Sequence, residues 1–319
     1  MRRTALHLPK FIPPQKATLV DAAPTGGAWL HEMKLDGYRI QLHADGARIS
    51  TITSSGLDWT DKFRSIAEAA KRLRVKSAIL DGEVTVMRPD GVSDFGALQD
   101  AISDDRSDLM TYWAFDLLHV DNRSLVGEPL EARKAALEKL LKRLPKNSPI
   151  RYSEHVVGNG GKFYEAACKG GLEGIISKRR DGRYTSGRTD TWRKVKCRQR
   201  QEFVVGGWKK SDKIGIRSLL LGYYQRGELK YAGNVGTGFT HRTHVDLMKR
   251  FKSLETTTCP LKGVPREDVR QARWLKPVLV AEVEFAEWTS DGVLRHPAFK
   301  GLREDKDPKE IRRELAARR

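Results

Sequence analysis

The pattern of apolar residues changes near residue 200, and this change constrains the fold more than any other feature of the sequence. Before this point, short alternating runs typical of strands are mixed with segments of helical periodicity. After it, short β segments follow one another with glycine between them. A chain of 319 residues has room for two ordinary domains. We therefore predict a mixed α/β domain over residues 1–198 and a mainly β domain over residues 199–319.

The N-terminal domain is predicted to contain helices as well as strands. Residues 9–27 are rich in Pro and Gly and are expected to form an extended lead-in. Apolar residues recur with helical spacing at 61–74 and 131–144. Alternating apolar residues predict strands at 29–33, 38–43, 48–53, 77–87, 112–118, 174–177 and 191–196.

The C-terminal domain is predicted to be a small β-barrel. One helix, at 240–251, interrupts its β segments. The predicted strands are 203–208, 218–224, 229–235 and 280–288. A few short strands with one helix between them are typical of a barrel of the oligonucleotide- and oligosaccharide-binding (OB) type.

The charge of the chain indicates the class of partner. Lys and Arg number 59 against 41 Asp and Glu, a formal net charge of +18. Such an excess favours a polyanionic partner, either nucleic acid or an acidic membrane surface. The sequence has no signal-peptide core and no apolar run of membrane-spanning length. We expect a soluble cytoplasmic protein that does not bind membranes.

The cysteines are not expected to bind zinc. Cys168, Cys197 and Cys259 form no CxxC pair and no cluster with His at zinc-finger spacing. An odd and sparse set suits a reducing compartment. We therefore interpret all three as small apolar side chains.

Residues 32–39, with the sequence EMKLDGYR, carry the strongest chemical signal. A lysine at the end of one predicted strand, followed by a glycine turn, projects its amine into the space between strands. Neighbouring cations or desolvation would lower the pKa of Lys34 and free the amine as a nucleophile. Lys178, Lys194 and Lys196 are the candidate cations. Residues 194 and 196 should leave the same face of their strand, a pair suited to an α-phosphate.

Carboxylates accompany these lysines. Asp81 and Glu83 share a predicted strand, and Glu173 precedes the segment GIISK. Hard oxygen ligands of this kind hold Mg²⁺ beside nucleotide phosphates; Asp81 is better interpreted as a turn or network residue. Glu173 and Lys178 are five positions apart, so both serve one pocket only if Glu173 lies in the preceding turn or a bulge intervenes.

Five short motifs then occur in the order used by covalent nucleotidyltransferases. They are KxDG at Lys34, DGE at Asp81, YWAFD at Tyr112, EGxxxK at Glu173 and KVK at Lys194. Their order and spacing resemble those of the corresponding motifs in ATP-dependent DNA ligases, RNA ligases and mRNA capping enzymes. Longer stretches, such as FIPPQKATLVDAAPTGGAWLHEMKLDGYR and VAEVEFAEWTSDGVLRHPAFKGLREDK, are similar to the ligase module of the bacterial end-joining ligase D. The resemblance implies an α/β nucleotidyltransferase (adenylation) domain followed by an all-β OB-fold barrel.

The resemblance also implies residue roles. Lys34 matches the lysine that binds AMP covalently, Glu32 a position near the adenine amino group, and Phe115 the aromatic ring stacked on adenine. Glu83 and Glu173 match the metal-linked carboxylates. Arg303, Asp305 and Lys306 match the last motif, which closes over ATP. The implied ATP-binding set is Glu32, Arg39, Glu83, Phe115, Lys178, Lys194, Lys196, Arg303 and Lys306.

One position departs from the family pattern. Ser54 stands where relatives usually carry an arginine that helps bind the nucleotide or the nick. Arg48 and Arg64 are candidates to replace it.

The implied activity is an ATP-dependent DNA ligase that seals nicks or breaks in duplex DNA without reading sequence, as in non-homologous end joining. ATP and Mg²⁺ or Mn²⁺ are the implied cofactors. We expect a monomer, with Ku or other end-joining proteins as candidate partners. Two alternatives remain: an RNA ligase or capping-type enzyme that shares the lysine chemistry, and a catalytically impaired OB-type DNA-binding protein.

Overall fold

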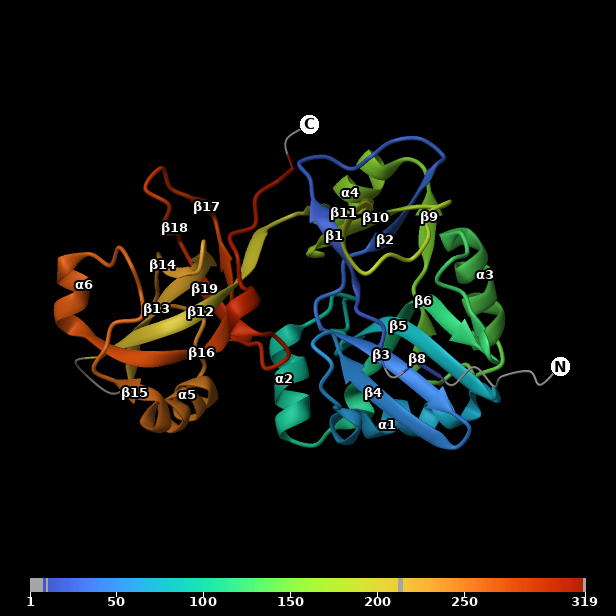
Figure 1. The fold of residues 1–319 in the computed structure, drawn as a ribbon, viewed down its shortest axis with the longest axis horizontal. Coiled ribbons are helices and arrows are strands. Elements are labelled where there is room, and N and C mark those ends of the chain that lie inside the picture. Colours follow the sequence, from blue (N-terminus) through green and yellow to red (C-terminus); the bar gives the residue numbers. More distant parts are fainter. Residues whose placement is uncertain (1–7, 10, 212–214, 318–319) are drawn as a thin grey trace. The chain divides into compact units, whose positions relative to one another are not determined.

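The computed structural model describes residues 8–9, 11–211 and 215–317. The chain divides by its internal contacts into two compact units (Figure 1). The first runs to Cys197 and takes in Ala316 and Ala317 as well, and the second spans Arg198–Leu315. Each unit is described by itself below.

One sheet of the first unit is built around the hairpin that follows Gly37. Its strands lie in the order β4-β3-β5-β6-β7, and β8 pairs with β6 in parallel. Strand β3 runs two residues beyond its predicted end, to Asp45, and Gly46 then adopts the positive φ that a tight hairpin requires. The strands are β3 (Tyr38–Asp45), β4 (Arg48–Thr53), β5 (Ser77–Thr85), β6 (Thr111–Val120), β7 (Arg123–Ser124) and β8 (Ile150–Tyr152).

A second sheet of the first unit has the order β1-β11-β10-β2-β9. The lead-in is extended as predicted, and part of it is a strand, β1, that pairs in parallel with β11. Strand β2 has the predicted bounds, whereas β11 begins four residues earlier than expected. The strands are β1 (Gln15–Leu19), β2 (Trp29–Met33), β9 (His155–Val157), β10 (Gly174–Arg179) and β11 (Gly187–Lys196).

The helices of the first unit were predicted in part. Helix α3 (Leu130–Leu141) confirms the predicted helix there. The predicted helix at 61–74 is wrong as a single element: it is a 3₁₀ turn, a short helix α1 (Arg64–Ala70) and a second 3₁₀ turn (Lys71–Leu73), after which Arg74 has positive φ. Helices α2 (Phe95–Ser103) and α4 (Gly160–Lys169) were not predicted.

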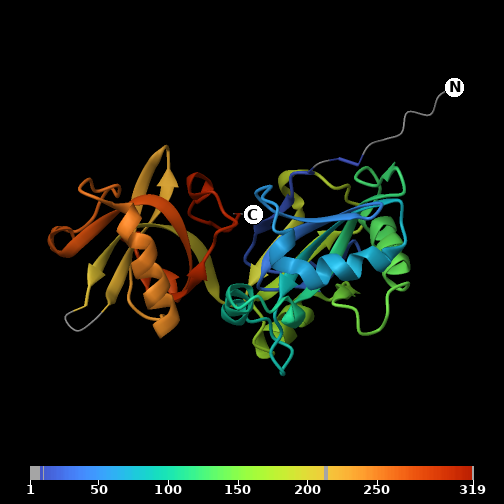
Figure 2. The same cartoon turned by 90° about the horizontal axis from the view of Figure 1, so that it is seen from below.

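The second unit is mainly β. A curved antiparallel sheet has the order β14-β13-β12-β16-β15, with β19 also pairing with β16. Helix α5 (His241–Leu254), orange in Figure 2, begins at a capping box formed by Thr240 and Thr243. The other elements are β12 (Gln199–Lys210), β13 (Ile216–Gln225), β14 (Glu228–Val235), β15 (Glu255–Thr256), α6 (Arg266–Gln271), β16 (Ala272–Phe285), β17 (Glu287–Trp288), β18 (Leu294–Arg295) and β19 (Ala298–Leu302).

Each unit has its own apolar core. In the second unit, Phe203, Trp208 and Phe251 are buried among aliphatic residues of β13 and β16, and the rings of Trp208 and Phe251 lie 5.5 Å apart. Trp192 of the first unit and Trp208 of the second are buried. No helix within the described residues is long and apolar enough to cross a membrane.

The interpretation of all three cysteines as small apolar side chains is wrong. Cys168 of α4 and Cys197, directly after β11, form a disulfide, while Cys259 carries a free thiol. The two bonded residues are 29 positions apart in the sequence. They meet because α4 packs on the sheet that contains β10 and β11, a tertiary contact that spacing alone does not reveal.

Candidate active site

Lys34 lies directly after β2, and its backbone is fixed against two neighbouring strands. Its N–H donates to the carbonyl of Gly174 at 2.9 Å. The turn that follows passes close to β5: a Cβ on Gly37 would lie 2.0 Å from the carbonyl oxygen of Val84. Only glycine permits this approach, which explains the glycine in the KxDG motif.

The side chain of Lys34 forms an ion pair with Glu173. Nζ lies 2.5 Å from Oε2, and the two side chains are 20% and 9% exposed. Glu173 lies in a bend before β10, which confirms the first of the two explanations for its spacing from Lys178. Gly174 makes the bend possible, because a Cβ there would lie 2.1 Å from the carbonyl oxygen of Val195.

The environment of Lys34 is anionic, contrary to the expectation that cations depress its pKa. Burial alone would lower the pKa, but Glu173, Asp36 and Glu83 outweigh it and hold the pKa of Lys34 above its usual value. With these neighbours alone the amine is protonated at neutral pH. Lys178 lies on β10, and Lys194 and Lys196 lie on β11.

Lys194 and Lys196 flank this position on β11. In the pairing of β10 with β11, Lys196 lies opposite Gly174 and Lys194 lies opposite Ile176. Ile176 in turn lies opposite Glu32 of β2. Directly opposed residues project to the same face, so both lysines and Glu32 share one face of this sheet. This confirms that Lys194 and Lys196 leave the same face.

Glu32 is buried between two lysines on that face. Nζ of Lys178 lies 2.6 Å from Oε2 of Glu32, and Lys134 of α3 donates to Oε1. Burial would raise the pKa of Glu32, but the two lysines outweigh it and hold the pKa below its usual value. The structure therefore places Lys178 with Glu32, and the ion pair of Lys34 is with Glu173.

Aromatic rings line the neighbourhood of Lys178. Its Nζ lies 4.2 Å from the ring centroids of both Phe115 and Trp192. The two rings meet edge to face, with centroids 6.0 Å apart. Phe115 is only half-buried.

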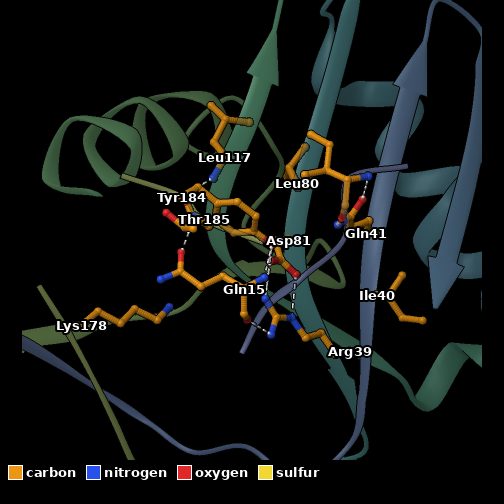
Figure 3. A network of polar contacts seen from close by, with 12 residues as sticks. Gln15, Arg39, Ile40, Gln41, Leu80, Asp81, Leu117, Lys178, Tyr184 and Thr185 are labelled. Atoms are coloured by element: carbon orange, nitrogen blue, oxygen red, sulfur yellow. Dashed lines mark hydrogen bonds and ion pairs between the residues drawn. The ribbon is translucent and has the colours of Figure 1, made fainter. Parts of the chain in front are cut away.

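Arg39 and Asp81 form the centre of a polar network next to these rings (Figure 3). Arg39 donates to both carboxylate oxygens of Asp81, at 3.0 and 2.6 Å, and to the carbonyl of Gln15 at 2.6 Å. Tyr184 donates to Asp81 at 2.8 Å, and its oxygen accepts from the N–H of Gln15. Asp81 is thus a network residue, as expected, and Arg39 is held 5.3 Å from the ring centroid of Phe115.

Glu83 lies on β5, directly opposite Arg39 in the pairing of β3 with β5. It is half-buried and contributes to the negative potential at Lys34. Glu83 and Glu173 therefore supply carboxylates from two different sheets to the surroundings of one amine. No cluster of three or more Asp, Glu, His or Cys side chains suited to a metal occurs in the part of the chain that the structure describes.

The residues of the last motif lie in the second unit. Arg303 is buried there and donates to Asp305 at 2.8 Å and to Glu282 at 3.0 Å. Nζ of Lys306 lies 3.5 Å from Glu202. These contacts describe the second unit alone.

Of the two candidate replacements for the arginine missing at Ser54, Arg48 lies at the far end of β4. Ser54 follows the end of β4, whereas Arg48 begins that strand, which spans about 17 Å for its length. Arg64 lines a surface depression together with Arg48 and forms an ion pair with Asp105.

Sequence reasoning missed two participants in this site. Lys134 was counted only as part of a helix, because a lysine on a helix is ordinarily solvated. Tyr184 lies in a loop that carried no motif. The pairing of Lys134 with Glu32 joins residues 102 positions apart, so no local pattern could have indicated it.

Two family models match the chain. Residues 14–196 match the ATP dependent DNA ligase domain, and residues 212–306 match the ATP dependent DNA ligase C terminal region.

Curated relatives match over most of the chain. The multifunctional non-homologous end joining protein LigD of Pseudomonas aeruginosa is 37% identical over 316 residues, which is 97% of this chain and 37% of that protein. The LigD protein of Mycobacterium tuberculosis is 37% identical over 291 residues, which is 90% of this chain and 37% of that protein. The chain thus spans little more than a third of the length of these relatives.

Solved structures agree with this assignment. Mycobacterial DNA ligase D complexed with ATP and MES is 35% identical, with a TM-score of 0.69 over 94% of this chain and 98% of that one. The ligase domain of M. tuberculosis LigD is also 35% identical, with a TM-score of 0.52 and the same coverage. The fold predicted from the sequence, an adenylation nucleotidyltransferase domain followed by an OB-fold domain, is confirmed. This chain belongs to the ATP-dependent DNA ligase family.

Proposed function

We propose that this chain is a DNA ligase that seals nicks or breaks in duplex DNA through a lysyl-AMP intermediate. The observation that carries the proposal is the position of Lys34. Its amine lies at the end of β2, held by Glu173, beside a sheet face that carries Glu32, Lys194 and Lys196. We assign to these side chains the roles of nucleophile, phosphate-binding cations and base-binding carboxylate.

The first step forms a bond between Nζ of Lys34 and the α-phosphorus of ATP and breaks the bond to pyrophosphate. A lysine attacks only when it has lost a proton, and the pair with Glu173 holds that proton in place. Attack therefore requires the Glu173 contact to be broken or neutralised. Lys194 and Lys196 offset the negative charge that grows on the phosphate oxygens.

Glu83 and Glu173 fit a divalent cation, Mg²⁺ or Mn²⁺. Mg²⁺ is commonly held by one or two carboxylates, with phosphate oxygens and water completing its shell, so the small number of protein ligands is compatible with it. When bound, such an ion neutralises phosphate charge. A carboxylate bound to the ion would also stabilise the protonated form of Lys34 less, and this would favour the neutral amine.

The remaining ATP-binding roles follow the positions of the side chains. We assign the base to Glu32, Lys178 and the face of Phe115, because these three groups lie together. Arg39 next to Phe115 is assigned to the sugar and phosphates. Arg303 and Lys306 are assigned to the outgoing pyrophosphate from the second unit.

Two further steps complete the proposed reaction. The 5′-phosphate of a DNA strand attacks the phosphorus of lysyl-AMP, which releases Lys34 and leaves AMP on the DNA end. The adjacent 3′-hydroxyl then displaces AMP and seals the strand. We propose duplex DNA bound through its backbone as substrate, a cytoplasmic monomer as the acting form, and domains 1–198 and 199–319 as its parts. Ku or another end-joining protein is the proposed recruiting partner, in keeping with the end-joining names of the LigD relatives.

Labelling with α-labelled ATP tests the first step. Wild-type protein incubated with this nucleotide and Mg²⁺ is expected to carry label through a denaturing gel. The variant Lys34→Ala should carry none, while Lys139→Ala, which removes an exposed lysine of α3, should label normally. Label on Lys34→Ala would overturn the assignment of the nucleophile.

The alternatives are separated by the same assay. A wild-type protein without label would favour an impaired DNA-binding protein, and labelling from GTP instead of ATP would indicate a capping-type enzyme. Adding nicked DNA or nicked RNA to labelled protein then distinguishes a DNA ligase from an RNA ligase, because only the true substrate accepts the labelled AMP from the protein.

A further inference from the structure

We propose that Lys134 is a positioning residue that makes the base pocket selective for a purine with a 6-amino group. The inference rests on the proposed function, in which Glu32 faces the base of a nucleotide bound at Lys34. Lys134 lies on α3, outside the motifs that indicated the site, and acts through Glu32.

The buried amine of Lys134 forms an ion pair with Glu32. Its side chain is 2% exposed and donates to Oε1 of Glu32 and to the carbonyl of Ser153, the latter at 2.9 Å. Its Nζ also lies 4.4 Å from the ring centroid of Tyr152. A lysine is almost never fully buried unless it is paired, so this orientation reflects a specific contact.

The preceding residue fixes the direction of Lys134. Arg133 is completely buried and donates to both oxygens of Asp116 on β6, at 2.7 and 2.8 Å. It also donates to the carbonyl of Gly182 at 2.9 Å. These charge-assisted bonds hold this turn of α3 against the sheet. They therefore restrict movement of the backbone from which the Lys134 side chain extends.

The two lysines that contact Glu32 hold different oxygens of its carboxylate. Lys178 holds Oε2 and lies against the rings of Phe115 and Trp192, on the side where a base would stack. Lys134 holds Oε1 from the helix side. A carboxylate held at both oxygens cannot rotate, and while ionised it only accepts hydrogen bonds. Its remaining lone pairs suit the N–H donors of an exocyclic amine and reject a carbonyl at the same position.

The charge balance of the cluster indicates that the contact can be removed without unfolding the site. Lys134, Lys178 and Glu32 together carry a formal charge of +1. When Lys134 is replaced by Met, the carboxylate of Glu32 is still paired with Lys178. No buried charge therefore loses its last partner. Glu32 then keeps one fixed oxygen and gains rotational freedom.

The test compares two labelled nucleotides. Purine riboside triphosphate has hydrogen where ATP has its 6-amino group, so the ratio of adenylylation efficiencies measures recognition of that amine. Wild type is expected to prefer ATP strongly. In Lys134→Met the preference should fall by about 10-fold or more, through slower labelling from ATP and little change for the analogue. Lys139→Met, on the exposed side of the same helix, should keep the wild-type ratio.

A purely structural role predicts a different result. General loosening of the pocket would slow both nucleotides alike, and an unchanged ratio in Lys134→Met would overturn the proposal. If Lys134→Met does not fold, Lys134→Gln, which keeps a donor but loses the charge, serves for the same comparison.

A double-mutant cycle with Glu32→Gln tests the route of action. If Lys134 acts through Glu32, adding Lys134→Met to Glu32→Gln changes the ratio no further, whereas an additional loss would contradict the proposal. Absence of label on wild type would overturn the proposed function and this inference together. Normal labelling with equal ratios in wild type, Lys134→Met and Lys139→Met would overturn this inference alone.

Discussion

Buried charged residues in the first unit take their protonation state from one or two specific partners. Lys34 is protonated because Glu173 outweighs the effect of its burial, and Glu32 is ionised because two lysines surround it. His43 on β3 is the opposite case. It is 5% exposed, its Nε2 lies 3.2 Å from Gln41, and burial lowers its pKa to about 4 although Asp58 partly opposes this.

The low pKa of His43 predicts a loss of stability in mild acid. The unfolded chain binds a proton at His43 below about pH 6.5, whereas the folded protein does so only near pH 4. Between these values the unfolded state holds more protons, so the free energy of unfolding falls as pH decreases, by up to about 3 kcal/mol. This contribution is fully present above pH 6.5.

Urea unfolding at pH 7 and pH 5 measures this effect. The variant His43→Gln should lose less stability between the two pH values than wild type, because it lacks the proton linkage. Other groups titrate equally in both proteins, so equal losses would show that His43 contributes nothing.

At the residue scale, the sequence predicted those members of the site that lie in motifs. Lys34, Glu173, Lys194 and Lys196 stand close to strand ends, where short spacing rules place them. Lys134 could not be found in this way, because its contact with Glu32 depends on how α3 packs on a distant strand. The direction of the pKa shift of Lys34 was also wrong in the prediction, since the count of nearby lysines carries no information on which carboxylate is nearest.

At the element scale, strands were predicted better than short helices. Strands β2 and β4 have the predicted bounds. Helix α2 depends on a single cap, with the Asp94 side chain accepting from the N–H of Ala97. Helix α4 begins in a glycine-rich segment, a composition that favours loops, so packing on the sheet overrides local preference.

Close packing of β10 on β11 makes Gly174 sensitive to substitution. In Gly174→Ala the new Cβ would meet the carbonyl of Val195 at 2.1 Å, so the strands must separate where Glu173 and Lys34 are held. We expect labelling by ATP to fall by about 100-fold, since small displacements of reacting groups have costs of that order.

Gly161→Ala is a matched control for this prediction. Gly161 lies in α4 with nothing within 4 Å of a Cβ, so the substitution should leave both labelling and stability intact or slightly improved. Normal labelling of Gly174→Ala would show that the Glu173 bend tolerates movement.

At the scale of the whole molecule, the net charge of +18 predicts salt-dependent binding to nicked duplex DNA. Each phosphate neutralised by a Lys or Arg releases counterions, so affinity should fall as a power of the salt concentration. For about five phosphate contacts, the slope of log K against log salt is about −4.5, a loss of several hundred-fold between 50 and 200 mM.

Fluorescence anisotropy with a labelled nicked duplex measures this slope. Two unrelated DNA sequences should give the same slope and similar affinities, because backbone contacts carry no sequence information. Affinity that is independent of salt would contradict binding through the basic surface.

The bond between Cys168 and Cys197 closes residues 168–197 into a covalent ring. This ring contains Glu173, Lys178, Lys194 and Lys196, the last four motif positions before the second unit begins at Arg198. A protease cut in the loop between β10 and β11 would therefore leave both fragments joined, and they would separate on a gel only after reduction. These four of the groups proposed to bind the nucleotide therefore lie in one covalently closed segment, and local unfolding cannot separate its two ends.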